Sequence, residues 1–270
     1  NGTFTDVALS AGVALGEDGG ARGAMGTDAV DYDGSGYPSL LVGNFSNQML
    51  ALYRNSGKGI FVDESPRSQL GRSSLLDLTF GAFFFDYDLD GLPDIFCANG
   101  HIEERISSAQ PRLQYKQPPL LFRNEGQGKF QDVSRSSGSA LERPIVARGA
   151  AYGDLDNDGD LDVVITTNNG PAYLLRNDGG NRNHWLTVKT VGKKSNRDGL
   201  GAFVTVRSAK GTQTRMVRSG SSYCSQSQLA LTFGLGTDTH VTSIEVKWPD
   251  GHIQKLGPQA VDRYLIIDEK

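Results

Sequence analysis

Short runs of apolar and β-branched residues, separated by turns rich in Gly, Asn, Asp and Pro, extend along the whole chain. In the middle of the chain four such runs follow one another, at residues 80–85, 93–98, 119–123 and 129–133. Their β-branched and aromatic content, with a turn-forming residue at each boundary, predicts four β-strands. No segment shows the sustained 3.6-residue periodicity of an amphipathic helix, so the pattern predicts an all-β protein.

This four-strand unit recurs, and its clearest mark is an aspartate-rich loop between the first and second strands. The loops begin at Asp31, Asp86 and Asp154, at intervals of 55 and 68 residues. Two further markers keep a similar spacing: Phe-x-Asp at Phe4, Phe61 and Phe130, and the pairs Arg54-Asn55, Arg123-Asn124 and Arg176-Asn177. Because a propeller blade is a four-stranded sheet that packs against its neighbours, the repeat predicts a partial β-propeller of about three blades.

Two features suggest that this array is incomplete. A propeller closes with about four to eight blades, so we expect the rest of the ring to lie outside this chain. The third unit also lacks a Phe-x-Asp strand of its own, and Phe4-Thr5-Asp6 could fill that gap as an edge strand. The extra length of the second unit lies in residues 100–118, which we interpret as a solvated surface loop, with a docking site as the alternative.

The aspartate loops carry the candidate chemistry. Loop two places carboxylates at positions 1, 3, 5 and 9, and Gly91 at position 6. Loop three repeats the pattern with Gly159 at position 6. The candidate ligands, including the position-7 backbone carbonyls, are Asp86, Asp88, Asp90, Leu92 and Asp94, and Asp154, Asp156, Asp158, Asp160 and Asp162. Carboxylates this close together repel one another unless a cation is present, and Ca²⁺ tolerates irregular oxygen coordination better than Mg²⁺.

The loops differ from an EF-hand, because position 12 is Cys97 or Ile165 instead of Glu and the flanking segments are predicted strands. Asp-Gly turns are also common in ordinary hairpins, which is the structural alternative. Loop one is degenerate, with Asp31, Asp33 and Ser35 as candidate ligands and Asp28 just ahead of them. The sequence therefore predicts two calcium sites and a third, degenerate one.

Composition and charge exclude some classes of partner and of location. The net charge is −4 and the basic residues are scattered, so we expect no nucleic-acid partner. No apolar run is long enough to cross a membrane. The two cysteines, Cys97 and Cys224, are interpreted as separate buried thiols, with one bridge between them as the alternative.

The loops, with Gly81-Ala82 and Gly149-Ala150 ahead of them, resemble FG-GAP (VCBS-type) repeats of integrin-α-like propellers. The C-terminal part resembles the ASPIC/UnbV domain in several blocks: Asn183-His184-Trp185-Leu186, residues 196–202, Gly220-Ser221-Ser222-Tyr223, Ser225-Gln226-Ser227, residues 233–236 and residues 246–251. Loop one departs from the repeat by two lost carboxylates, and Cys224 stands where a larger apolar residue is expected. The resemblance implies calcium-binding propeller loops in a secreted or cell-surface protein.

A polar linker at residues 177–183 divides the predicted blades, residues 1–180, from a small β-sandwich or barrel, residues 181–270. The predicted strands there are 186–191, 202–207, 214–218, 229–233, 244–248 and 264–267. The polar groups at Asn196-Arg197-Asp198 and at Ser221-Ser222-Tyr223 to Gln226 are interpreted as hydrogen-bonded turns, with a recognition patch for a glycan or protein as the alternative.

The chain contains none of the common catalytic signatures. It lacks a Gly-x-Ser-x-Gly elbow and a Gly-x-Gly-x-x-Gly loop, and its four histidines have no zinc-ligand spacing. His101, beside Glu103 and Glu104, is the histidine worth testing. We therefore expect a non-catalytic, extracellular or cell-surface module (periplasmic or on the outer surface if bacterial) that binds a protein or glycan. The alternatives are a carbohydrate-active enzyme and an accessory scaffold subunit.

Overall fold

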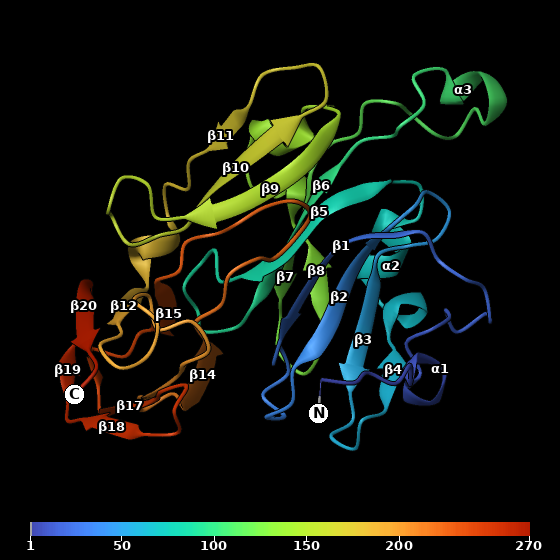
Figure 1. Ribbon diagram of the computed structural model, residues 1–270. Helices are drawn as coiled ribbons and strands as arrows, with labels where there is room; N and C mark the ends of the chain where they lie inside the picture. Colours follow the sequence, from blue (N-terminus) through green and yellow to red (C-terminus); the bar gives the residue numbers. More distant parts are fainter. Residues whose placement is uncertain (1) are drawn as a thin grey trace.

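The computed structural model describes residues 2–270, and their main feature is a series of antiparallel sheets (Figure 1). We call the first three sheets blade one, blade two and blade three. Blade one contains β1 (Ala24–Val30), β2 (Ser39–Asn44), β3 (Ala51–Asn55) and β4 (Phe61–Asp63), paired in that order. Blade two contains β5 (Thr79–Phe85), β6 (Asp94–Asn99), β7 (Leu120–Asn124) and β8 (Phe130–Asp132). The four strands predicted for the second unit are confirmed within two residues.

Blade three has only three strands, β9 (Ala147–Gly153), β10 (Asp162–Thr167) and β11 (Tyr173–Leu175), with β11 at its edge. The prediction that Phe4-Thr5-Asp6 completes this sheet is wrong. Phe4 belongs to no strand and its side chain is fully exposed. The N-terminal segment instead follows blade one, where a Cβ on Gly12 would lie 2.6 Å from the Phe61 carbonyl oxygen.

The helices of the described residues are all short. They are α1 (Ala8–Ala11), α2 (Gln69–Ser74), α3 (Ile106–Ala109) and the 3₁₀ turns η1 (Ser65–Arg67), η2 (Ser134–Ser136), η3 (Ser139–Glu142) and η4 (Gly180–Arg182). Within residues 2–270, none of these helices has the length and apolar character that a membrane-spanning helix needs.

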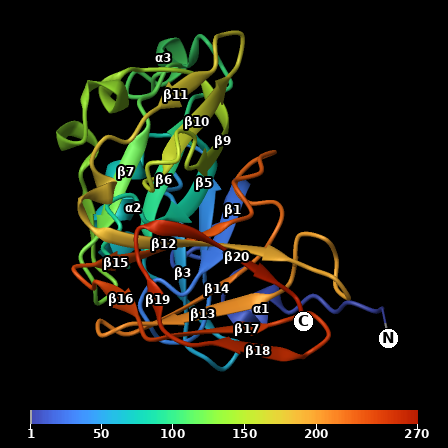
Figure 2. The ribbon, with the colours of Figure 1, turned by 90° about the vertical axis from the view of Figure 1, so that its left-hand side faces the viewer.

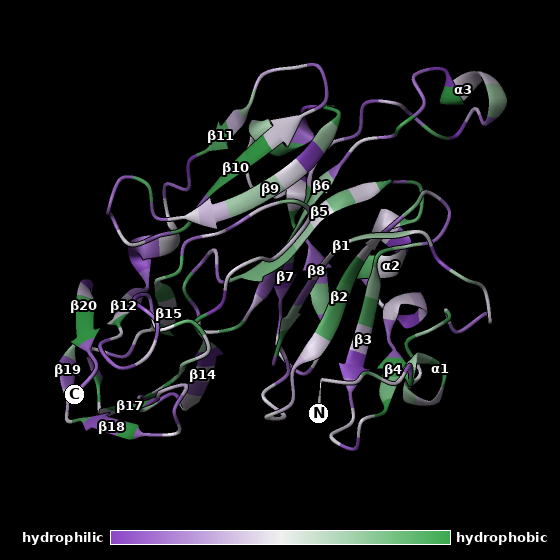
Figure 3. Ribbon diagram, in the orientation of Figure 1, coloured by the Kyte–Doolittle hydropathy of each residue, from purple (hydrophilic) through white to green (hydrophobic). Residues whose placement is uncertain are grey.

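The blades pack face to face because successive side chains of a strand point to opposite sides of its sheet. In β5, Ala82 and Phe84 belong to the core between blades one and two. Phe83 and Phe85 belong to the core between blades two and three. Every residue of β5 is buried, which explains its unbroken apolar sequence. In Figure 3 the hydrophobic colouring follows the strands, and the connecting loops are mostly hydrophilic.

The C-terminal residues form three more sheets around one further core (Figure 2). The first has the order β15-β12-β20, the second β14-β13-β17-β18, and β16 and β19 form a two-stranded ribbon. Their bounds are β12 (His184–Val191), β13 (Phe203–Arg207), β14 (Thr212–Met216), β15 (Leu231–Gly236), β16 (His240–Val241), β17 (Ser243–Lys247), β18 (Ile253–Leu256), β19 (Gln259–Ala260) and β20 (Arg263–Asp268). The six predicted strands are present, and β16, β18 and β19 were missed.

The described residues therefore form five sheets of three or four strands and one ribbon. The prediction of about three blades and a separate C-terminal domain does not match this arrangement. The C-terminal part is not separate, because residues 219–228, between β14 and β15, run along the first strands of all three blades. We call residues 219–228 the cross-blade segment. Composition alone marked a polar linker at 177–183 but carried no sign of these long-range contacts.

The cross-blade segment is held by hydrogen bonds to each blade in turn. Ser222 bridges Thr27 of β1, and its Oγ accepts the backbone N–H of Ala82 in β5 at 3.1 Å. In blade three, Ser227 Oγ accepts the N–H of Tyr152 at 3.2 Å. Gln228 Oε1 accepts the N–H of Asp154 at 3.1 Å, at the start of loop three. These contacts give the serine-rich run a structural role.

Candidate metal centre

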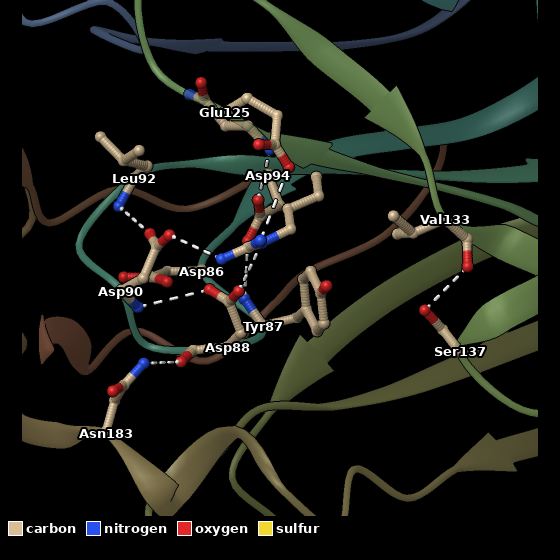
Figure 4. A network of polar contacts seen from close by, with 12 residues as sticks. Asp86, Tyr87, Asp88, Asp90, Leu92, Asp94, Glu125, Val133, Ser137 and Asn183 are labelled. Carbon is tan, nitrogen blue, oxygen red and sulfur yellow. Dashed lines mark hydrogen bonds and ion pairs between the residues drawn. The ribbon is translucent and has the colours of Figure 1, made fainter.

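Loops two and three each gather three carboxylates at the end of a blade (Figure 4 shows loop two). Asp86 directly follows β5, and Asp94 begins β6 opposite Phe85 in the antiparallel ladder. This pairing brings Asp86 at position 1 close to Asp94 at position 9. The turn between them places the Asp88 carboxylate beside both. In Asp86, Asp88 and Asp94, one oxygen each lies within 4.8 Å of the others. The residues Asp154, Asp156 and Asp162 of loop three form the same arrangement.

Each cluster contains one buried carboxylate oxygen without a hydrogen-bond donor. These oxygens are Asp86 Oδ1 and Asp154 Oδ1. The second oxygen of each residue accepts a glycine N–H at position 6, from Gly91 at 3.0 Å and from Gly159 at 2.9 Å. A buried, unpaired carboxylate oxygen is costly, whereas an oxygen-preferring cation would satisfy it. The position-1 residues therefore fit a metal ligand in both loops.

The surroundings of Asp86 and Asp94 in loop two disfavour ionisation of these two carboxyl groups. The pKa of Asp86 is raised to about 7, mainly by burial and also by the neighbouring Asp90 and Asp88 charges, although the Arg215 guanidinium lowers it. Burial and the Asp86 charge also raise the pKa of Asp94 well above its ordinary value. A divalent cation would reverse this balance by favouring the charged forms.

The position-5 aspartates lie outside these two groups. Asp90 Oδ1 accepts the Leu92 N–H at 2.8 Å, and its Oδ2 lies 3.4 Å from Arg123. In loop three, Asp158 Oδ1 accepts the Asp160 N–H at 3.2 Å. Asp90, Asp158 and the Leu92 and Asp160 carbonyls stay predictions as ligands.

Loop one differs from loops two and three in the hydrogen bonds that its carboxylates accept. Both carboxylate oxygens of Asp31 already accept loop N–H groups, from Ser35 at 3.0 Å and from Gly36 at 2.8 Å. Asp33 Oδ1 accepts the same Ser35 N–H at 3.2 Å. Asp28 does not contribute, because its buried carboxylate pairs with Arg218 at 2.5 Å and accepts the Phe84 N–H at 2.9 Å.

The Arg-Asn marker holds each loop closed through its asparagine. The N–H of Asn124 donates to Asp94 Oδ1 at 2.8 Å, and the N–H of Asn177 donates to Asp162 Oδ1 at 2.9 Å. In blade one the position-9 residue is Ser39, whose Oγ accepts the Asn55 N–H at 3.0 Å. Position 9 therefore has a structural role in all three blades, and in two of them its carboxylate also faces the cluster.

The same asparagines join neighbouring blades. The Asn124 side-chain amide donates to the Tyr32 carbonyl of loop one at 3.0 Å. The Asn177 amide donates to the Tyr87 carbonyl of loop two at 2.7 Å. The repeated marker was visible in the sequence, but this link from one blade to the next was not.

Basic side chains contact the carboxylate cluster of loop two. Arg123 binds Asp88 at 2.8 Å, Arg215 lies 3.7 Å from Asp86, and Lys210 Nζ donates to the Asp90 carbonyl. Among the described residues no ion pair reaches the cluster of loop three, where the Tyr264 hydroxyl donates to Asp154 Oδ2 at 2.6 Å. The sequence analysis missed Arg215, Lys210 and Tyr264, because only the tertiary fold brings them to the loops.

Trp185 covers loop three from the C-terminal side. A Cβ on Gly159 would lie 2.0 Å from Trp185 Cε2, so only glycine fits beneath this ring. Gly159 also has a φ of +103°, which disfavours other residues independently.

The remaining candidates from the sequence are dispersed. His101 is buried, its Nδ1 accepts the Glu103 N–H at 3.0 Å, and Glu103 and Glu104 are exposed. Both cysteines are free, with Cys97 buried and Cys224 exposed, so the interpretation of two buried thiols is wrong for Cys224. Asn196 closes a turn through Leu200, whose N–H it accepts at 2.7 Å.

Comparison with known proteins agrees with this architecture. Residues 31–97 and 113–165 match the FG-GAP-like repeat, and residues 192–270 match ASPIC and UnbV. The chain thus carries FG-GAP-like repeats followed by an ASPIC/UnbV segment, which confirms the resemblance predicted from its motifs.

Two curated relatives extend the likeness over most of the chain. Cartilage acidic protein 1 from Homo sapiens is 28% identical over 263 residues, which cover 93% of this chain and 36% of that protein. Cartilage acidic protein 1 from Xenopus tropicalis is 28% identical over 258 residues, covering 94% and 37%. The chain therefore spans little more than a third of the length of these relatives.

Among solved structures, one concerns recognition of non-reducing terminal N-acetylglucosamine by an Agrocybe aegerita lectin. It is 16% identical, with 87% of this chain and 65% of that chain covered and a TM-score of 0.31. This likeness is too weak to carry an argument about the present chain.

Proposed function

We propose that the chain is a non-catalytic, extracellular calcium-binding module that presents a surface to a protein or glycan ligand. The observation that carries this proposal is the pair of buried, unpartnered oxygens, Asp86 Oδ1 and Asp154 Oδ1, each within a three-carboxylate cluster. Calcium is the preferred ion, because the donors are carboxylate oxygens in irregular hairpin loops. Two ions would bind, at loops two and three, and loop one would bind weakly or not at all.

The metal would stabilise the fold and take no part in a reaction. It would neutralise carboxylates at the points where the first and second strands of a blade meet. Extracellular calcium sites have Kd values of about 0.1–1 mM. With calcium tenfold above Kd, one site contributes about 1.4 kcal/mol, a substantial share of the stability of a folded domain.

The proposed division is residues 1–180 for the repeats and residues 181–270 for the ASPIC/UnbV-like part, with the cross-blade segment joining the two. An extracellular location and a protein or glycan partner are part of the same proposal, supported by the FG-GAP-like repeats and the likeness to cartilage acidic protein 1.

Chelation tests the proposal directly. Excess EGTA should lower the melting temperature by several degrees, and added calcium in excess of the chelator should restore it. Magnesium at the same concentration should restore less, since it requires near-ideal octahedral geometry. A melting curve that EGTA leaves unchanged would contradict structural calcium.

The enzyme alternative has its own test. The triple variant His101→Ala, Glu103→Gln and Glu104→Gln should leave any glycosidase activity of the preparation unchanged. A large loss, with the melting curve preserved, would favour the enzyme over the binding module.

A further inference from the structure

The arginine of the repeated Arg-Asn marker takes a different partner in each blade. In blades one and three it pairs with a carboxylate outside the aspartate loop, Arg54 with Glu64 at 3.0 Å and Arg176 with Asp178 at 2.8 Å. In blade two, Arg123 instead pairs with Asp88 at 2.8 Å and lies 3.4 Å from Asp90. Among residues 2–270, the marker arginine therefore forms ion pairs with an aspartate loop only in blade two.

Arg123 engages an oxygen that a bound cation would use. Its Nε donates to Asp88 Oδ2 at 2.8 Å, and Asp88 Oδ1 accepts the N–H of Asp90 at 3.3 Å. Both oxygens of this position-3 carboxylate thus have donors already. The corresponding residue of loop three is Asp156, which is exposed, and within the described part of the chain no ion pair reaches it. Position 3 is therefore open to a cation in loop three and occupied by a guanidinium group in loop two.

Two further cations reach loop two from the C-terminal part. Arg215 of β14 lies 3.7 Å from Asp86 Oδ2, and its side chain is 17% exposed, against 39% for Arg123. Lys210, in the turn between β13 and β14, donates to the Asp90 carbonyl oxygen. Solvent and salt screen the charge of a partly buried group only weakly. The positive charge of Arg215 therefore acts on the carboxylate cluster at nearly full strength.

Loop three has a neutral partner where loop two has a charged one. Asp154, which corresponds to Asp86, accepts a hydrogen bond from the uncharged Tyr264 hydroxyl at 2.6 Å. Charges of the same sign repel, and the repulsion grows where water is excluded. A divalent ion that enters loop two must approach two guanidinium groups. An ion that enters loop three meets no such group among residues 2–270.

We propose that Arg123 and Arg215 act as counter-ions of loop two, so that calcium binds loop three first and fills loop two only at a higher concentration. This order of filling rests on the proposed calcium function and adds a regulation of the same two sites. The arginines stabilise the empty loop and weaken calcium binding for one reason, because they neutralise the carboxylates that calcium would neutralise. Arg215 and Lys210 belong to the C-terminal part, so that part also controls the affinity of a loop in the repeats.

Equilibrium dialysis of the full chain against calcium, after removal of bound metal, tests the order. Asp86→Asn leaves loop three as the complete cluster, and Asp154→Asn leaves loop two. The Kd of the Asp154→Asn chain should exceed that of the Asp86→Asn chain by about tenfold or more. Equal values, or tighter binding by loop two, would overturn the order of filling and leave the proposed function intact. Calcium binding by neither variant nor the wild type would overturn both.

Substitution of Arg123 in the Asp154→Asn chain tests the counter-ion itself. Arg123→Gln removes the charge and should tighten calcium binding at loop two by about five- to tenfold. Arg123→Lys keeps the charge and should bind more weakly than Arg123→Gln. Arg54→Gln is the matched control, because this marker arginine pairs with Glu64 of blade one, and it should change the Kd by less than about twofold. An Arg123→Gln chain that binds calcium no more tightly would overturn the proposal.

Melting curves distinguish a counter-ion from an ordinary structural ion pair. In EGTA, Arg123→Gln should melt below the wild type, because Asp88 and Asp90 lose their partner. Saturating calcium should then raise its melting temperature more than it raises that of the wild type. Arg215→Gln should show the same two effects, with Arg215→Lys as the control that keeps the charge. A lower melting temperature in EGTA without the larger calcium response would identify a purely structural pair and overturn the proposal.

Wild-type crystals soaked at a series of calcium concentrations give the order without any substitution. The anomalous peak among Asp154, Asp156 and Asp162 should appear at a lower calcium concentration than the peak at loop two. This measurement keeps the test valid if Asp86→Asn or Asp154→Asn proves poorly folded by its melting curve. Peaks that grow together, or a loop-two peak that appears first, would overturn the proposal.

Discussion

The hydroxyl of Tyr264, in β20 of the C-terminal part, donates a 2.6 Å hydrogen bond to Asp154 at the first position of loop three. The other oxygen of Asp154 is the buried one without a donor. The C-terminal part thus donates a hydrogen bond to Asp154 Oδ2, and Asp154 Oδ1 is the oxygen proposed to bind a cation. The proposed metal site of loop three and the docking of the C-terminal part consequently share one residue, Asp154.

Tyr264→Phe should remove this support without changing the shape of the side chain. We expect a loss of about 1 kcal/mol, or a fall of about 2–4 °C in melting temperature, since hydrogen bonds to charged groups exceed the neutral average but Tyr264 is partly exposed. Tyr37→Phe is the matched control, because the Tyr37 hydroxyl has no hydrogen-bond partner among residues 2–270. Equal shifts in the two variants would show that the Asp154 bond contributes nothing.

Arg218, the residue immediately before the cross-blade segment, pairs with Asp28 of blade one. Their 2.5 Å ion pair buries the Asp28 carboxylate completely. Arg218→Ala would leave that charge without its partner, so we expect a loss of about 3 kcal/mol in urea unfolding. The exposed pair Arg197–Asp198 supplies the control, and Arg197→Ala should change stability by less than about 0.5 kcal/mol. Adding Asp28→Asn to Arg218→Ala should recover part of the loss; no recovery would mean that Arg218 acts through packing alone.

Glu269 provides a pH-dependent test of the C-terminal part. Burial raises the pKa of this carboxyl, but donors from residues 193–195 lower it more strongly, to about 2. Its Oε2 accepts the N–H groups of Lys193 and Lys194, both at 2.7 Å. The folded pKa lies below the ordinary value of 4.5, so the stabilisation is present above pH 4.5 and is lost as the pH falls toward 2.

Glu269→Gln should therefore destabilise the protein at pH 7, and the difference from the wild type should shrink as the pH falls from 4.5 toward 2. Urea unfolding at a series of pH values measures this difference. Glu245→Gln, which removes only a surface partner of Lys255, should give a small difference with little pH dependence. A Glu269→Gln deficit that stays constant at low pH would contradict the ionised, hydrogen-bonded carboxylate.

Local pattern predicted the strands of blade two and the aspartate loops well, because both depend on residues close in sequence. The turn at Gly91 and the ladder that sets Asp94 opposite Phe85 are local. Contacts made by residues that are distant in sequence have no local pattern that would predict them. Arg215, Tyr264 and Ser222 lie more than a hundred residues from the groups that they contact.

The misplacement of Asp28 has the same origin. Asp28 was grouped with loop one because it precedes Asp31, but in β1 its side chain points into the space between blades and meets Arg218. The domain boundary indicated by the polar residues 177–183 stays a prediction, but this segment is not only a solvated linker, because Asn177 and Asn183 donate to the Tyr87 and Asp88 carbonyls of blade two. Polar composition does not distinguish a solvated linker from one whose hydrogen bonds are made within the fold.

A crystal grown in calcium tests the central claim most directly, through the anomalous difference density at loops two and three. The account predicts one peak among Asp86, Asp88 and Asp94 and another among Asp154, Asp156 and Asp162, each 2.3–2.6 Å from carboxylate oxygens. Asp154→Asn should lose the second peak and keep the first. Wild-type crystals at saturating calcium with no peak in either loop would contradict the claim that a divalent cation holds these carboxylates together.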